Sequence, residues 1–161
     1  MIRSRRRLSG RLPVRLTAVA LLWAAAGCSG TGGAPSVPVP SPPAAEAAAC
    51  RALYKALPKT VADLGRNDPE PHSELTAGWG DGEIVLRCGV PRPALMDDPQ
   101  AKGVDADGVN WMVEERDSGP RFTATYREPY VEVTMDSRFA HDVTPLAQLA
   151  ASVAKTIPSS V

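Results

Sequence analysis

The sequence contains no apolar run long enough to cross a membrane. Its most apolar uncharged stretch, residues 16–26, has about 11 residues, whereas a transmembrane helix needs roughly 20. No later segment is longer or more apolar, so the sequence predicts no transmembrane helix in the rest of the chain.

Histidine and cysteine are scarce, with 2 and 3 residues respectively. His72 and His141 stand alone, and Cys50 and Cys88 lack the paired spacing of zinc sites, so we expect no metal and no cofactor. The sequence also has no Gly-x-Ser-x-Gly motif, which disfavours a Ser/His/Asp hydrolase, although Asp142 follows His141 directly.

Acidic residues occur in pairs, but their spacing does not suit catalysis or calcium binding. Asp105 and Asp107 lack the third polar ligand and the distal acid of an EF-hand, and Asp107-Gly108 is better interpreted as a turn into a strand. Glu114 and Glu115 would point to opposite faces of a strand. These pairs therefore predict no acid–base site.

Positive charge is concentrated at the start of the chain. Residues 1–15 carry six arginines and no acid. Without them the chain has 12 basic and 18 acidic residues, a net charge of −6, which argues against nucleic acid as a partner.

The same segment begins a targeting signal. The basic residues 1–15, the apolar residues 16–26 and the small residues before Cys28 follow the order of a secretory signal. With a cysteine just after the cleavage site, the segment resembles a bacterial lipoprotein signal. We therefore expect a signal peptide over residues 1–27, a lipid on Cys28, and attachment to the extracytoplasmic face of the cell membrane.

Two alternatives concern processing and export. Ala25 stands three residues before Cys28, where lipoprotein signals usually have Leu, so cleavage by the general signal peptidase stays open. The arginines at positions 5–7 also fit a twin-arginine signal as an alternative export route.

Composition divides the remainder into a tether and one domain. Residues 28–43 are rich in Gly, Ser and Pro, which predicts a spacer that is flexible first and extended polyproline later. Residues 44–161 have the size of a single domain. Apolar spacing predicts a helix over residues 44–57, and Thr144-Pro145 predicts the cap and first turn of another.

Between the helices, apolar and polar residues alternate in runs typical of half-buried strands, namely residues 83–90, 109–114, 121–126 and 130–135. One apolar face per strand suits an antiparallel sheet with helices on a single side. We predict an α+β fold: a four-stranded antiparallel meander with N- and C-terminal helices packed on one face, in the order α-β-β-β-β-α.

This arrangement predicts a disulfide between Cys50 and Cys88. Cys50 shares the apolar stripe of the first helix with Leu53 and Leu57, and Cys88 lies on the apolar face of the first strand. If the helix packs on that face, the two sulfurs meet in the core. Export to an oxidising location favours the bond.

Several motifs carry a family resemblance: Cys50 in the first helix, Trp79-Gly80, then Ile84-Val85-Leu86-Arg87-Cys88-Gly89-Val90 followed by Pro91 and Pro93, and Gly108-Val109-Asn110-Trp111. With these motifs, which cover most of the chain after the tether, the sequence resembles a family of actinobacterial lipoproteins (domain of unknown function thirty-five-fifteen). The resemblance implies export and usually membrane attachment. It implies no reaction and no known ligand.

These observations lead us to expect a lipid-anchored envelope domain without enzymatic activity that binds a protein or cell-wall partner. The candidate contact residues are Trp79, Met112 and Tyr130, together with the long connection over residues 91–108. Trp79 also fits a core position. The alternatives are a small-molecule or lipid carrier with a pocket between helices and sheet and, less favoured, a hydrolase.

Overall fold

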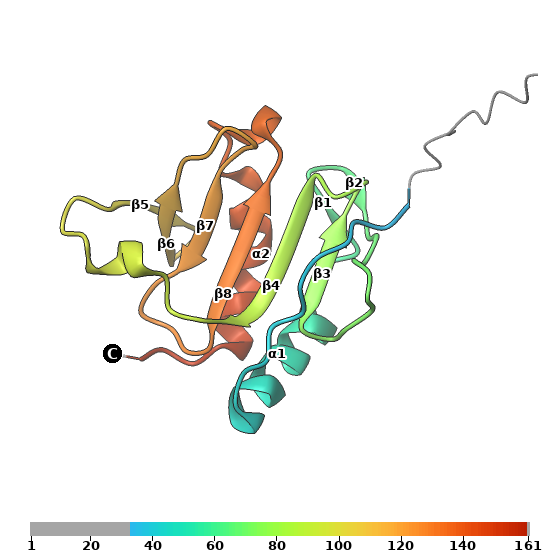
Figure 1. Ribbon diagram of the computed structural model, residues 1–161, viewed down its shortest axis with the longest axis horizontal. Coiled ribbons are helices and arrows are strands. Elements are labelled where there is room, and N and C mark those ends of the chain that lie inside the picture. Colours follow the sequence, from blue (N-terminus) through green and yellow to red (C-terminus); the bar gives the residue numbers. More distant parts are fainter. Residues whose placement is uncertain (1–32, 161) are drawn as a thin grey trace, which may run out of the picture. The chain divides into compact units, whose positions relative to one another are not determined.

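The structure is a computed structural model that describes residues 33–160 (Figure 1). The predicted signal peptide and Cys28 lie outside the described residues. The elements in chain order are α1 (Ala44–Ala56), β1 (Thr60–Val61), β2 (Leu64–Gly65), β3 (Thr76–Trp79), β4 (Ile84–Val90), the 3-10 helix η1 (Ala94–Asp97), β5 (Lys102–Ala106), β6 (Val109–Glu114), β7 (Arg121–Ala124), β8 (Tyr130–Met135), the 3-10 helix η2 (Ser137–Phe139) and α2 (Thr144–Thr156).

The predicted four-stranded meander is wrong. The main sheet has six antiparallel strands in the order β3-β4-β8-β7-β6-β5, and β1 and β2 form a separate two-stranded sheet. Strands β6, β7 and β8 are successive neighbours, but β4 pairs with β8 rather than with β6. The cause is the connection over residues 91–101, which carries the chain from β4 to the far edge, so that β8 returns beside β4 (Figure 1).

The two strands missing from the prediction form the edges of the main sheet. At one edge, β5 pairs with β6 through a two-residue turn in which Asp107 and Gly108 both have positive φ, at 51° and 80°. That geometry is the type I′ turn that Asp-Gly favours. At the other edge, β3 pairs with β4 through a turn in which Gly80 and Gly82 have positive φ.

One face of the sheet is apolar and carries both helices. The cross-strand neighbours Ala77, Leu86, Val133 and Phe122 form a buried row on this face. Leu53 of α1 and buried residues of α2 belong to the same core, and the two helices contact each other. The recess beside the Cys50–Cys88 pair has no room for a water molecule, so the space between helix α1 and the sheet is filled there.

Helix α2 begins at Thr144, but its side chain does not cap the helix. Instead, the carboxylate of Asp142 accepts a hydrogen bond from the Thr144 N–H at 2.9 Å. An acceptor at this end of a helix pairs one of its otherwise unbonded N–H groups.

The second half of the predicted tether lies against the domain. The Val37 N–H donates to the Glu70 carbonyl at 3.0 Å, and the Glu70 N–H donates to the Pro35 carbonyl at 2.9 Å. Pro40 is buried, and a Cβ on Gly89 would stand only 2.5 Å from the Pro42 ring. Residues 35–42 therefore run past the loop before β3 and the β3–β4 turn and reach the end of β4 at Gly89 (Figure 1).

The predicted disulfide is confirmed. Cys50 and Cys88 are bonded, with their Cα atoms 5.5 Å apart, and each residue is 1% exposed. Because Cys50 lies on α1 and Cys88 on β4, the bond attaches the first helix to the sheet.

We expect reduction of this disulfide to lower the free energy of unfolding by about 2–4 kcal/mol, because closing a loop of 38 residues restricts the unfolded chain. Urea unfolding of the oxidised protein and of the Cys50→Ala/Cys88→Ala variant would measure this difference. A Cys28→Ala variant serves as the control for losing a cysteine. Equal unfolding midpoints for the oxidised protein and the double variant would contradict the prediction.

Candidate functional site: a groove on the helix-free face

The face of the main sheet opposite the helices, called here the helix-free face, carries a ladder of alternating charges. Arg87 on β4 contacts Glu132 on β8 at 3.2 Å, and Arg121 on β7 contacts Glu132 at 3.5 Å and Glu114 on β6 at 3.4 Å. Glu132 is only 6% exposed. The two guanidinium groups offset the free-energy cost of burying the Glu132 carboxylate. The side chains of this ladder cover the centre of the helix-free face.

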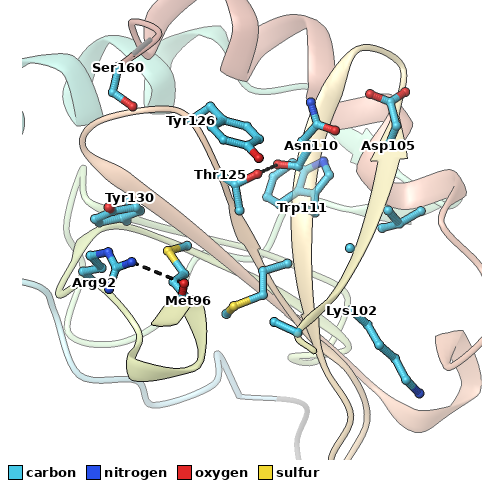
Figure 2. A pocket seen from close by; sticks show the side chains of 14 residues that line it. Arg92, Met96, Lys102, Asp105, Asn110, Trp111, Thr125, Tyr126, Tyr130 and Ser160 are labelled. Carbon is cyan, nitrogen blue, oxygen red and sulfur yellow. Dashed lines mark hydrogen bonds between the residues drawn. The ribbon is translucent and has the colours of Figure 1, made fainter. Parts of the chain in front are cut away.

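Beyond the ladder, toward β5, the helix-free face is hollowed. A groove with a cavity volume of about 480 Å³ lies between the sheet and the connection that carries η1 (Figure 2). Its lining mixes aromatic, thioether and polar side chains: Arg92 and Met96 from the connection, Asp105 from β5, Asn110 and Met112 from β6, and Thr125, Tyr126 and Tyr130 from around the β7–β8 turn. The volume lies in the range of about 300–1,000 Å³ that is common for ligand sites.

One wall of the groove is held by Arg92. Its guanidinium donates to the Asp97 carboxylate at 2.7 Å and to the Met96 carbonyl at 3.3 Å. These bonds close the short turn of η1, in which no residue is buried. The wall is therefore fixed by polar contacts rather than by a core of its own.

The opposite rim is formed by Tyr126, whose side chain is exposed. Tyr126 has a φ of 59° and the residue is 60% exposed. Its carbonyl accepts a hydrogen bond from the Ser160 N–H at 3.0 Å, and the neighbouring Arg127 donates to the Ile157 carbonyl at 2.7 Å. A left-handed backbone is unfavourable for a tyrosine, and such strain is concentrated at functional sites.

The structure separates the three predicted contact residues. Met112 and Tyr130 both line the groove, whereas Trp79 is fully buried in the core and donates from its ring N–H to the Pro58 carbonyl at 3.1 Å. The long connection contributes one wall through residues 91–101, and its remainder comprises β5 and the Asp107-Gly108 turn.

Sequence reasoning missed Tyr126, whereas Arg92 and Met96 lie in the connection over residues 91–108 that it named as a candidate contact region. Tyr126 was assigned to the apolar face of a strand, but β7 ends at Ala124 and the backbone then turns. The Glu128-Pro129 pair shortly after Tyr126 was the available signal that the strand had ended.

The residues considered for catalysis lie outside the groove. His72 and His141 are both exposed, and His72 lies edge-on to Tyr54 with their ring centroids 6.2 Å apart. Hydrogen bonds from Thr144 lower the pKa of Asp142, so this carboxylate serves the start of α2 rather than His141.

The paired carboxylates likewise bind separate partners. Glu114 pairs with Arg121, and Glu115 pairs with Lys102 at 2.8 Å. Asp105 accepts a hydrogen bond from the Gly108 N–H at 3.2 Å within the hairpin turn. Within residues 33–160, no three His, Cys, Asp or Glu side chains gather as metal ligands.

A second polar cluster joins α1 to the loop before β3. Tyr54 donates to Asp68 at 2.6 Å, Arg66 also donates to Asp68, and the Gly78 N–H lies 3.4 Å from the same carboxylate. The Arg66 guanidinium lies 4.7 Å from the centre of the Tyr54 ring and 5.1 Å from that of Trp79. The polar groups of this cluster are paired with one another by hydrogen bonds. The cluster therefore attaches the loop to α1 and is not a reactive site.

The negative charge of the Asp68 carboxylate contributes to this attachment. Burial raises the pKa of Asp68, but the hydrogen bonds from Arg66 and Tyr54 together lower it more, and the net shift is downward. A lowered pKa means that the ionised carboxylate stabilises the fold above its unfolded pKa of about 3.9. This contribution disappears as the pH falls through the lower native value.

We therefore expect Asp68→Asn to destabilise the protein by about 1–3 kcal/mol at pH 7 and by clearly less at pH 3. Urea unfolding at the two pH values would measure the difference. Asp117→Asn, at an exposed carboxylate with no ion pair among the described residues, is the matched control. An equal loss of unfolding free energy for Asp68→Asn at both pH values would show that the charge of Asp68 does not contribute to stability.

No helix in residues 33–160 combines the length and apolar character required to span a membrane.

Comparison with known proteins identifies the family but no close relative. No curated protein and no solved structure matches the chain. The family model described as Protein of unknown function (DUF3515) matches residues 11–161. Since this match spans nearly the whole sequence, the chain belongs to the DUF3515 family.

Proposed function

We propose that this protein is an exported, lipid-anchored cell-envelope domain that has no enzymatic activity and binds a protein or cell-wall partner in the groove of the helix-free face. The observation that carries the proposal is the combination of a 480 Å³ groove with the strained and exposed Tyr126 on its rim. Exposed aromatic side chains next to polar groups are typical of binding surfaces.

The position of the groove favours a partner over a carried small molecule. A carrier would hold its ligand between helices and sheet, where the core is closely packed beside the disulfide. The groove instead lies on the outside of the sheet, and its rim residues Arg92, Asp105, Asn110 and Tyr126 are exposed. A surface groove of this kind accepts part of a larger molecule.

The chemistry of the groove favours binding over catalysis. Its lining includes no cysteine and no histidine among the described residues. The Thr125 hydroxyl donates to the Asn110 carbonyl, and Arg92 is paired with Asp97. The lining therefore lacks the cysteine or histidine on which a nucleophile–base pair for acyl transfer most often depends.

Export is supported by two independent features. Residues 1–28 have the order of a lipoprotein signal. The buried Cys50–Cys88 disulfide is of a kind that persists in oxidising compartments outside the cytoplasm. Actinobacterial origin remains part of this proposal and rests on the sequence motifs alone.

We expect Cys28→Ala to move the protein from the membrane fraction to the soluble fraction or to block its maturation, because the lipid on Cys28 would supply the attachment. Cell fractionation with immunoblotting would measure this. Ser29→Ala, one residue away, is the matched control and should stay with the membrane. A Cys28→Ala protein that fractionates like the wild type would contradict lipidation.

For the groove, we expect Tyr126→Ala to abolish partner capture while changing the free energy of unfolding by less than about 0.5 kcal/mol, since the side chain is exposed. Capture is measured by crosslinking in intact cells followed by pull-down and mass spectrometry. Val143→Ala removes another exposed apolar side chain, outside the groove, and is the matched control.

The His141→Ala variant distinguishes the binding proposal from the hydrolase alternative. The binding proposal expects its captured partners and cellular role to equal those of the wild type. If His141→Ala lost the cellular role while the domain stayed folded, or if Tyr126→Ala captured the same partners as the wild type, the groove would not be the functional site.

A further inference from the structure

We propose that the partner presents an extended, basic peptide segment, which adds as a seventh strand to the outer edge of β5 and places alternate side chains in the groove. This inference rests on the proposed function and names the class of partner. The partner is then an envelope protein rather than a cell-wall glycan.

The backbone of β5 offers unpaired hydrogen-bonding groups at defined positions. The Asn110 carbonyl accepts from the Thr125 N–H at 2.8 Å, so the backbone groups of Asn110 point toward β7. Successive residues of a strand alternate, so those of Trp111 point toward β5 and pair with Val104. The N–H and C=O groups of Gly103 and Asp105 therefore point outward, and neither has a backbone partner in residues 33–160.

The other edge of the sheet is already occupied. The Asn67 N–H donates to the Gly78 carbonyl at 2.9 Å, and Arg66 forms a bridge with Trp79. Strand β3 is thereby protected against further pairing, as natural sheet edges usually are. Strand β5 has no such cover in the described part of the chain, and an exposed edge is where extended peptides add to sheets.

The groove lies beside this edge on the correct face. Gly103 and Asp105 are the register partners of Met112 and Asn110, and all four residues line the groove. Figure 2 shows Asp105 and Asn110 side by side at the end of the hairpin. An added strand would direct every second side chain to the same face. Gly103 has no side chain to cover the groove, which leaves the room for the side chain of the added strand.

Negative charge at the groove and on the chain as a whole favours a basic occupant. The Asp105 carboxylate is exposed, faces the groove and forms no ion pair with another described residue, so it would attract a Lys or Arg of the added strand. The net charge of −6 expected for the exported chain also favours a basic partner.

A second copy of this chain fits less well. Antiparallel pairing of two β5 strands about Val104 would bring the Asp105 carboxylates of both copies onto one face, as diagonal neighbours of like charge about 7–8 Å apart. It would also direct only Gly103 and Asp105 toward the groove, and their side chains are too short to fill it.

The test uses random linear 12-residue peptides displayed on phage and selected on the purified full-length protein in detergent. Selected peptides are synthesised, and their affinity is measured by fluorescence anisotropy. We expect basic peptides that Gly103→Pro weakens at least tenfold, because proline removes the outward N–H of an edge position. Asp105→Asn should weaken them less, through the lost charge, and Val143→Ala should leave them unchanged.

A second measurement does not depend on how the variants fold. N-methylation of the peptide at every second residue should abolish binding, whereas N-methylation of the intervening residues should not, because only one set of N–H groups faces β5. Peptides that tolerate N-methylation at every position, or that bind Gly103→Pro as they bind the wild type, would overturn strand addition.

Three further results would also overturn it: no peptide enriched over background, a homodimer that Gly103→Pro dissolves, or retention of purified peptidoglycan that depends on Tyr126 but not on Gly103→Pro. The last of these leaves the proposed function standing. Loss of the proposed function itself would appear differently, as partner capture in cells that Tyr126→Ala does not reduce.

Discussion

The structure depends on the alternation of side chains along β4 and on its register against β8. Leu86 and Cys88 face the helices, where Cys88 is bonded to Cys50 of α1. The same alternation necessarily turns Arg87 to the other face, opposite Glu132. A shift of one residue would bury the arginine under α1 and expose the cysteine. The disulfide and the charge ladder therefore specify the same register from opposite sides of the sheet.

Sequence reasoning succeeded where a pattern belongs to one element. The helix over residues 44–57 matches α1 within one residue, and residues 83–90 and 130–135 match β4 and β8 closely, because long apolar alternation leaves little choice of structure. The disulfide was predictable for the same reason, since it required only that the stripe of one helix meet the face of one strand.

Strand β5 and the strand order could not be predicted in this way. Lys102-Gly103-Val104-Asp105-Ala106 has two charges and a glycine, so it carries no strand pattern of its own. Its structure comes from the Asp107-Gly108 turn, which pairs it with β6. That turn was recognised as an entry into a strand, but a type I′ turn also requires a strand before it. Strand order depends on the path of residues 91–101, which no local pattern encodes.

The groove was only half predictable, because segments far apart in the sequence meet there. Met112 and Tyr130 were recognised as apolar or aromatic residues on the polar face of a strand. Tyr126 was not, since its exposure follows from a positive φ and from contacts with residues 157–160. The same features that weaken a sequence pattern, a glycine in β5 and an irregular backbone at Tyr126, are those that line the groove.

The two sides of the sheet carry different features: the polyproline segment lies at one side and the groove at the other. Residues 35–42 lie at the β3–β4 side of the sheet, where they contact Glu70, Gly82 and Gly89. The groove lies at β5, four strand spacings of about 4.8 Å from β4, or about 19 Å away. The packed polyproline segment and the groove therefore lie at opposite sides of the sheet. Because this segment contacts the domain at Glu70 and Gly89, on the side of the sheet away from β5, a strand added to β5 would not displace it.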